Sequence, residues 1–289
     1  MTTPAESRAA LEALLLDRLG EGPEATFLAQ PVDLGTLATR LGETRRAVGS
    51  RPLVAGFQQR EQATLPTAWG PMKVGRWTTE HAARVVLLAR AAQAAAEPFA
   101  ALYSAYDQGD TETRTAVLHA LNFVEDSQVE PALETIADAG RTYLEVLMDA
   151  AWLDNPFGSA HLTDIQYRKG VLKALFCGLD VSRFIGIEGR ADAELATSLC
   201  QFADEREAAG RPVPHAVWLV SAKYPRPGLV ARLIGRMEHP LPEERRVAAL
   251  ALANAADARS RSFIEERLAR ETDPGVIEAL HQAQAAAAH

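Results

Sequence analysis

Apolar side chains recur at helical spacing along almost the whole chain. After Thr3-Pro4, the leucines Leu11, Leu15 and Leu19 lie on one face of a helix that ends at Gly20. A proline in the first turn and a glycine after the last turn are typical boundaries of an α-helix. The same spacing predicts two further helices, around residues 34–48 and 79–97.

Pairs of short helices joined by a capped turn form a recurring unit. From Asp110, an apolar face is followed by a break at Asp126-Ser127, a second apolar face and a stop at Gly140. The same arrangement returns after Pro242, with a new helix at Asp273-Pro274. Such pairs, repeated about every thirty to forty residues, are typical of HEAT-like repeats, whose neighbours bury each other's apolar faces. The sequence therefore predicts an all-α fold, a HEAT-like helical repeat array (α-solenoid).

No segment has the alternating pattern of β-branched residues that is typical of a strand. Two segments, residues 59–76 and 210–228, interrupt the helical pattern with proline and glycine. Both contain many loop-forming residues but are neither long nor strongly polar, so we expect them to bend the array and not to divide it. We therefore predict one continuous array over residues 1–289.

The composition is that of a folded, non-membrane protein. Hydrophobic residues make up 47% of the chain and charged residues 24%, which excludes a disordered protein. Acidic residues outnumber basic ones by 38 to 30, and the basic residues form no cluster of the kind that binds nucleic-acid phosphates. Charged residues cut every apolar run before it reaches the length of a membrane span, and no basic segment precedes an apolar run as in a secretory signal. We expect a cytoplasmic protein that binds no nucleic acid and has no integral membrane segment.

The central segment contains the densest mixture of charged, aromatic and loop-forming residues. Asn155-Pro156 ends a helix, and this asparagine either caps the backbone or contacts a ligand. In the helix opened by Thr163-Asp164, Tyr167 lies on the inward face, whereas Lys169 and Lys173 lie one turn apart. Two ammonium groups at that spacing repel each other unless they are solvated or an anion lies between them. Both interpretations of the lysines remain open from the sequence.

Three arginines extend this basic set. Arg141 and Arg190 belong to the same part of the chain, and Arg206 follows two acidic residues near the end of a helix that starts at Asp192. A run of both signs is usually a solvated, salt-bridged face. Helical arrays also offer extended inner surfaces, where these arginines would line a site for an anion. The candidate ligand-binding residues are therefore Arg141, Asn155, Tyr167, Lys169, Lys173, Arg190 and Arg206.

The chain lacks the short motifs that mark known chemistry. It has no nucleophile elbow, Walker loop, dinucleotide fingerprint or paired histidine and cysteine ligands for a metal. Cys177 and Cys200 lie on helical patterns and are expected to be small buried side chains. The sequence therefore predicts neither a metal nor a cofactor and assigns no catalytic residue.

Five ordered blocks over roughly seventy residues carry a family resemblance. They are Arg141-Thr142, Asp154-Asn155-Pro156-Phe157, Val171–Phe176, Glu188-x-Arg190-Ala191 with Glu194-Leu195-Ala196, and Glu205-Arg206-x-Ala208-Ala209-Gly210-Arg211. With these blocks the chain resembles the EboA family, small helical proteins encoded in the bacterial ebo operons associated with metabolite traffic. On this resemblance, residues 110–211 are a family-like core. The helical pattern by itself predicts HEAT-like repeats over residues 226–289.

Three positions depart from the family's pattern. Tyr167-Arg168-Lys169 stands where the family usually has Trp-Asn-Gln, Gly158-Ser159 replaces Pro-Ala after the Asn-Pro turn, and Asp204 replaces a histidine. If these groups contact a ligand, the resemblance implies that this chain accepts a different one.

The resemblance also implies a function. The family's operon neighbours resemble a prenyltransferase, a sugar-phosphate-isomerase-like barrel and a dehydroquinate-synthase-like enzyme. We therefore expect a cytoplasmic accessory protein of bacterial secondary metabolism, a binding scaffold whose concave face holds operon partner enzymes or a small anionic metabolite. The alternative is an enzyme acting on an anionic prenylated or cyclitol-like intermediate, with Arg141, Lys173 and Arg206 as substrate clamps.

Overall fold

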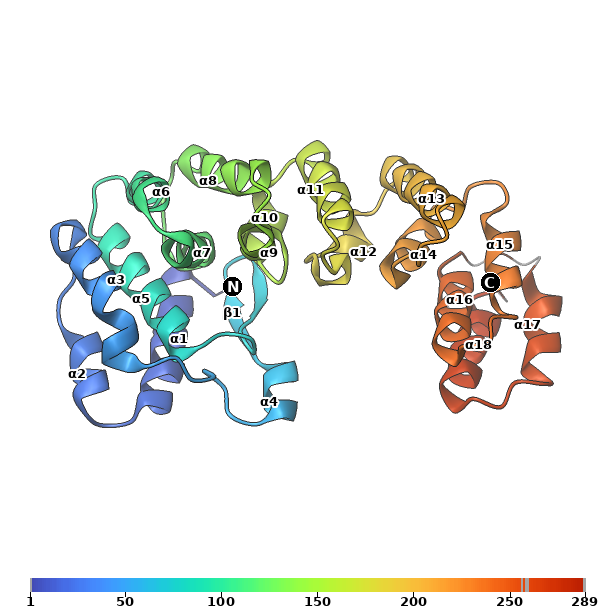
Figure 1. Cartoon of the computed structure of the whole chain (residues 1–289), viewed down its shortest axis with the longest axis horizontal. Coiled ribbons are helices and arrows are strands. Elements are labelled where there is room, and N and C mark those ends of the chain that lie inside the picture. Colours follow the sequence, from blue (N-terminus) through green and yellow to red (C-terminus); the bar gives the residue numbers. More distant parts are fainter. Residues whose placement is uncertain (1, 256, 258–259, 288–289) are drawn as a thin grey trace. The chain divides into compact units, whose positions relative to one another are not determined.

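The computed structural model describes residues 2–255, 257 and 260–287, and most of them are helical (Figure 1). In the first half of the chain, the elements are α1 (Pro4–Leu19), α2 (Pro23–Ala29), α3 (Leu34–Val48), α4 (Phe57–Gln62), β1 (Thr64–Thr67), β2 (Gly70–Lys73), α5 (Thr79–Gln93), α6 (Pro98–Gln108), α7 (Thr111–Ala120), η1 (Leu121–Phe123) and α8 (Glu130–Arg141). In the second half, they are α9 (Glu145–Trp152), α10 (Pro156–His161), α11 (Asp164–Phe176), η2 (Val181–Arg183), α12 (Ile187–Arg190), α13 (Ala193–Ala208), α14 (His215–Ser221), α15 (Leu229–Arg236), α16 (Pro242–Ala255), α17 (Arg261–Leu268) and α18 (Pro274–Ala286). The mainly helical fold predicted from the sequence is confirmed.

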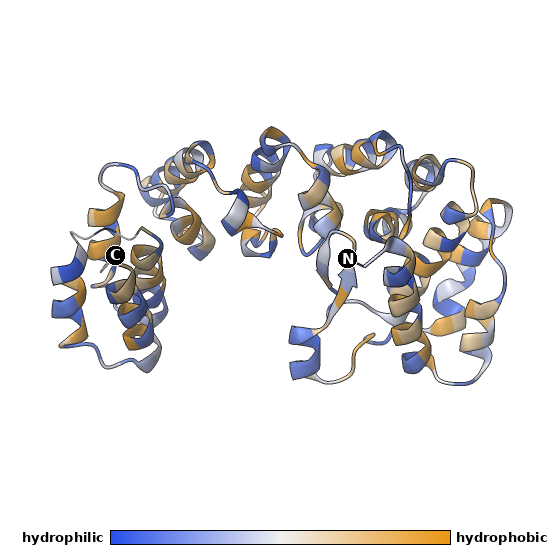
Figure 2. Cartoon of the chain, turned by 180° about the vertical axis from the view of Figure 1, so that it is seen from behind, coloured by the Kyte–Doolittle hydropathy of each residue, from blue (hydrophilic) through white to orange (hydrophobic). Residues whose placement is uncertain are grey.

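The chain folds into two compact units. Unit 1 contains Met1–Leu179 and Arg183–Ile185, and unit 2 contains Asp180–Ser182 and Gly186–His289. Hydrophobic and hydrophilic residues alternate along the helices of both units, as amphipathic helices require (Figure 2). No helix in the part of the chain that the structure describes has the length and apolar character needed to cross a membrane. The HEAT-like repeat and the single continuous array remain predictions.

Helix α5 is the centre of unit 1. It packs against α1, α3, α6 and α7, and nearly every one of its side chains is buried, including the charged Glu80 and Arg84. A helix that is apolar on most faces must be covered on most faces. Helix α7 packs in turn on α9, while α6 and α8 form a second layer over α7 and α9 (Figure 1). Unit 1 is therefore layered around α5.

A short antiparallel hairpin departs from the sequence prediction. Strands β1 and β2 pair in the segment expected to be loop, and they form the one sheet among the described residues. Proline is normally disfavoured in a strand because it donates no hydrogen bond to the neighbouring strand. Here Pro66 and Pro71 face each other in the register, so the two missing donors coincide at one pair. The turn residue Trp69 then packs edge-on against Phe157 of α10.

The three residues Arg183–Ile185 return to unit 1 after the chain has left it. The Arg183 guanidinium binds Asp149 at 2.6 and 2.9 Å and Asp154 at 2.8 Å. The ring of Phe184 stacks on Trp152, and the carbonyl of Ile185 accepts a hydrogen bond from the Tyr167 hydroxyl at 3.0 Å. These contacts close α9, α10 and α11 into one core.

In unit 2, a buried ion pair joins α16 to the turn before α18. Arg245 binds both carboxylate oxygens of Glu271 at 2.8 and 2.9 Å, and Arg267 binds the same carboxylate at 2.6 Å. The backbone amides of Thr272 and Asp273 also donate to Glu271. Hydrogen bonding by Arg245 lowers the pKa of Glu271 below its ordinary value of 4.5. Stability from this carboxylate is therefore present above about pH 4.5 and lost as the pH falls below it.

We expect Glu271→Gln to lower the free energy of unfolding by about 1.5–3 kcal/mol at pH 7, because hydrogen bonds to a charged group are lost. Urea denaturation of both proteins at pH 7 and pH 3 checks this. The difference between them should narrow at pH 3, where the wild type has lost part of this contribution. An unchanged difference at the two pH values would contradict the assignment.

A second prediction concerns the continuous array. Stacked repeats lose a stabilising interface when a neighbour is removed. A fragment of residues 1–185, which retains Arg183–Ile185, should therefore melt below the temperature at which unit 1 melts in the full chain. Calorimetry of both proteins measures this, and an equal melting temperature would indicate two independent domains.

Candidate functional site

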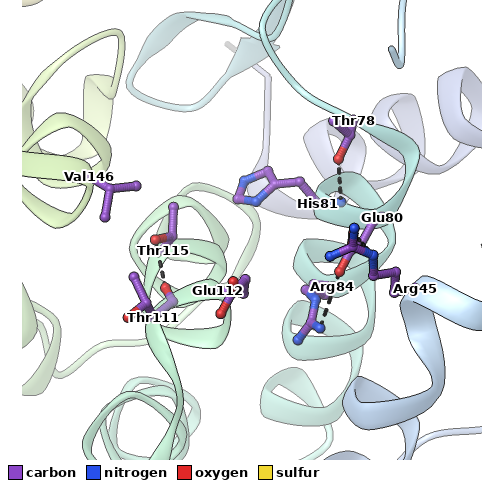
Figure 3. Close-up of a pocket in the computed structure, with 9 residues that line it drawn as sticks. All are labelled: Arg45, Thr78, Glu80, His81, Arg84, Thr111, Glu112, Thr115 and Val146. Carbon is purple, nitrogen blue, oxygen red and sulfur yellow. Dashed lines mark hydrogen bonds and ion pairs between the residues drawn. The ribbon is translucent and has the colours of Figure 1, made fainter. Parts of the chain in front are cut away.

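A polar cavity of about 310 Å³ lies in unit 1, where α5, α7 and α9 begin (Figure 3). Its lining residues, mostly polar, are Arg45, Thr78, Glu80, His81, Arg84, Thr111, Glu112, Thr115 and Val146. They come from α3, the first turns of α5 and α7, and the start of α9. Its volume is at the small end of ligand pockets, which span about 300–1,000 Å³. We call it the polar cavity.

Capping side chains place two of these helix starts. Thr78 accepts a hydrogen bond from the His81 amide at 3.1 Å and so begins α5, while Asp110 accepts from the Thr113 amide at 2.8 Å and begins α7. Each cap satisfies an amide that a helix start leaves without a partner. Helix α9 begins after Leu144 without a side-chain cap. The lining side chains of α5 and α7 are therefore held by local sequence signals.

A buried ion pair forms one wall of the polar cavity. Glu80 and Arg84 are one turn apart on α5, their charged atoms are 3.3 Å apart, and their side chains are only 11% and 9% exposed. Arg45 adds a longer contact, with its Nε 3.9 Å from Glu80. Arg84 also donates to the Thr113 hydroxyl over 3.4 Å, and its Nε finds no hydrogen-bond partner within the described structure. Buried charges need close partners, and those of Arg84 are at the long end of the normal range.

Two histidines extend the site toward the hairpin. His81 Nε2 lies 2.7 Å from His119 Nδ1, and the ring of Trp77 stacks on His119 at 4.9 Å. Burial lowers the pKa of His119 to about 3 and, with a smaller effect of His119 and Arg84, holds the pKa of His81 well below 6.5. Both rings are therefore neutral at pH 7, and one ring donates its N–H to the unprotonated nitrogen of the other. Figure 3 shows the His81 ring directed toward Thr115 and Val146.

The formal charges of the polar cavity balance. The positive charges of Arg45 and Arg84 equal the negative charges of Glu80 and Glu112. The neutral His81 and three threonines add hydrogen-bonding groups. Among the described residues, no group of three or more His, Cys, Asp or Glu side chains is placed to hold a metal ion. Such an arrangement suits a polar molecule that is neutral overall and carries several donors and acceptors.

Two of the predicted ligand residues make internal contacts. Asn155 is fully buried: its amide donates to the carbonyls of Leu118 and Ala150, and its oxygen accepts from Asn122 at 2.8 Å. It also caps α10 by accepting from the Phe157 amide at 3.2 Å, which is one of the two roles that the sequence left open. Tyr167 is 1% exposed and donates its hydroxyl to Ile185.

Two other predicted residues of unit 1, Lys173 and Arg141, lie at the end of α8. Lys173 donates to the carbonyl oxygens of Gly140 and Thr142, where a cation complements the C-terminal end of that helix. Arg141 is exposed and pairs with Glu134 and Asp138 at 3.1 and 3.0 Å. Lys169 is exposed. The structure thus brings Arg141 and Lys173 to one helix end, apart from the residues that line the polar cavity.

Two predicted residues belong to unit 2. The Nε of Arg206 donates to the Pro212 carbonyl at 2.7 Å, and the guanidinium lies 5.7 Å from the centre of the Phe202 ring. Arg190 ends α12 and is half-buried. A ligand role for all seven residues, Arg141, Asn155, Tyr167, Lys169, Lys173, Arg190 and Arg206, remains a prediction.

The polar cavity was missed from the sequence. In the sequence, Arg84 is one of the charged residues that cut the apolar runs, and Glu80 lies in the first turn of the same helix. The signal that was present is their spacing: a glutamate and an arginine four residues apart within an apolar helix form a pair on one face. On a helix that is buried all round, such a pair must lie inside the protein.

The comparisons with known proteins agree with the resemblance. The family model described as metabolite traffic protein EboA matches residues 25–222, which is more than half of the chain. The match includes the polar cavity and most of unit 1. No curated protein and no solved structure gave a match. The helical chain is thus of the class of metabolite traffic proteins. It belongs to the EboA family.

We expect Asn155→Ala to lower the free energy of unfolding by about 3 kcal/mol, because Asn122 and several backbone groups lose buried partners, each worth about 1–3 kcal/mol. Urea denaturation measures this. Gln62→Ala, at an exposed position of α4, serves as the surface control and should stay within about 0.5 kcal/mol of the wild type. An Asn155→Ala variant as stable as the wild type would contradict this structural role.

Proposed function

We propose that this EboA-family protein is an accessory protein that binds a small polar metabolite in the polar cavity of unit 1. The family's description as a metabolite traffic protein supports a role in handling such a molecule. The observation that carries the proposal is the incompletely satisfied Glu80–Arg84 pair, buried yet lining a cavity. A cavity into which a few polar and charged groups converge is the default indication of a binding site.

The balanced charges of the polar cavity indicate what this metabolite carries. A strongly anionic molecule gains from Arg45 and Arg84 but is repelled by Glu80 and Glu112. A neutral molecule with several hydroxyl groups, or a zwitterion, uses both signs without leaving a charge uncompensated. The neutral His81 either donates or accepts, depending on its tautomer. We therefore propose a hydroxyl-rich or zwitterionic ligand.

The proposal assigns binding and not turnover. The lining residues offer hydrogen-bond donors and acceptors, and the histidine pair is neutral because burial depresses its pKa. A cytoplasmic location, a place in secondary metabolism and the HEAT-like concave face are parts of the same proposal. Partner enzymes that deliver or receive the metabolite are the corresponding macromolecular partners.

The test uses two neighbouring arginines. Arg45 lines the polar cavity with a side chain 76% exposed, whereas Arg46 is 83% exposed and does not line it. Purified wild-type protein is mixed with a small-molecule extract of the native cells, and mass spectrometry identifies what it retains. We expect Arg45→Gln to weaken retention by roughly 10-fold to 100-fold, the loss of one hydrogen bond from a charged group, and Arg46→Gln to leave it unchanged.

Two outcomes would contradict the proposal. One is that the wild type retains no small molecule above the level of an unrelated helical protein. The other is that Arg45→Gln and Arg46→Gln retain the same molecule equally well. Melting temperatures of both variants control for a change in folding, which we do not expect at such exposed positions.

A further inference from the structure

A second cavity, of about 380 Å³, lies in unit 1 between α3 and α6. Leu37 and Leu41 of α3 and Ala101 and Ala105 of α6 contribute its apolar lining. Arg84 of α5 borders this cavity as well as the polar cavity. We call the second cavity the α3–α6 slot. Its lining also includes the polar residues Ser104, Gln108, Asp110 and Thr113.

Small residues create the α3–α6 slot. Both α3 and α6 pack on α5, and each presents two small residues four positions apart, Ala38 with Gly42 on α3 and Ala101 with Ala105 on α6. Residues at this spacing lie on one face of a helix. At these four positions no bulky side chain fills the space between the helices. The small residues of both helices therefore account for the open space of the slot.

The buried arginine that borders the α3–α6 slot has N–H donors whose hydrogen bonds are incomplete. Arg84 is 8% exposed, its bonds to Glu80 and Thr113 measure 3.3 and 3.4 Å, and its Nε finds no acceptor in the described part of the chain. A guanidinium carries five N–H donors. A buried guanidinium with long or missing hydrogen bonds is costly, so an acceptor that arrives with a ligand offsets part of that cost. The α3–α6 slot thus combines apolar lining residues with the guanidinium of Arg84 at its border.

The charges near the slot select an uncharged head group. Glu80 already pairs with Arg84. Asp110 also lines the slot, and hydrogen bonding by Thr113 lowers its pKa, so it is ionised at pH 7. One guanidinium against two carboxylates leaves a local negative charge that repels an anion. A neutral oxygen accepts the hydrogen bond without that repulsion.

We infer that the α3–α6 slot binds a small amphipathic molecule with a medium-length hydrocarbon chain and one uncharged acceptor, a hydroxyl or carbonyl oxygen. The chain lies against Leu37, Leu41 and Ala105, and the oxygen accepts a hydrogen bond from Arg84. The slot is a second site with a ligand of a different class from the polar cavity, so the inference goes beyond the proposed function. Either assignment fails or holds without the other.

The first experiment titrates the full-length protein with 1-octanol, 1-butanol and octanoate at pH 7 by calorimetry. We expect 1-octanol to bind most tightly, with affinity falling about fourfold for each methylene group removed. Octanoate has the same chain length but a charged head, and it should bind more weakly than 1-octanol. Tighter binding of octanoate, or equal binding of 1-butanol and 1-octanol, would overturn the inference.

The second experiment fills the slot. A Cβ at Gly42 meets no heavy atom within 4 Å, so Gly42→Leu extends into open space. Gly35→Leu on the same helix is the matched control, because Gly35 does not line the slot and its Cβ meets only Asp33 Oδ1, at an ordinary 3.5 Å. We expect Gly42→Leu to lower the affinity for 1-octanol at least about tenfold and Gly35→Leu to leave it unchanged, since only the former occludes the slot.

Both leucine variants should melt at or above the wild-type temperature, because leucine favours a helix more than glycine does. If Gly42→Leu melts lower, Ala38→Leu at an exposed position of the same wall repeats the measurement. Unchanged binding of 1-octanol to the folded filled variant would overturn the inference. Arg45→Gln, which alters only the polar cavity, should leave 1-octanol binding unchanged, and a loss there would place the bound alcohol in the wrong cavity.

Discussion

The structure of unit 1 depends on the burial of α5 on almost every side. Alanine and valine allow its neighbours to approach closely, yet the same helix carries Glu80 and Arg84 into the interior. Ionic groups there must compensate each other, and bulky charged side chains do not pack as closely as the alanines beside them. Both cavities of unit 1 described above are bordered by Arg84 for this reason. The central helix thus sets both the core and the positions where the core is incomplete.

Polar groups inside unit 1 fall into two kinds. Asn155 and Lys173 have their hydrogen bonds made by the protein itself, and they fix helix ends relative to one another. Arg84 makes only long bonds and keeps a donor without a partner. A fully satisfied polar network rigidifies a fold, whereas a partly satisfied one is stabilised further by an incoming acceptor. This difference separates polar groups whose hydrogen bonds the protein already satisfies from the arginine that we assign to ligands.

Local signals explain which parts of the structure the sequence predicted. Helix starts at Thr3, Asp110 and Thr163 were predictable because a cap and a periodic apolar face are encoded within a few residues. The hairpin was missed because Pro66 and Pro71 argue against strands unless their pairing is known. The contacts of Asn155 with Asn122 and of Lys173 with Gly140 join segments more than thirty residues apart, and no local pattern reveals them. Cys200 is buried as predicted, whereas Cys177 is only half-buried.

The path of the chain between the two units bears on how such a protein evolves. The chain enters unit 2 at Asp180, returns for Arg183–Ile185 and leaves again at Gly186. Arg183 compensates Asp149 and Asp154, so the returning residues are part of the earlier unit's core. If a genetic crossover between relatives fell at Asp180, the hybrid would carry Arg183 from one parent and Asp149 and Asp154 from the other. Crossovers after Ile185 keep these charges together, and we expect viable shuffled descendants to have their junctions there.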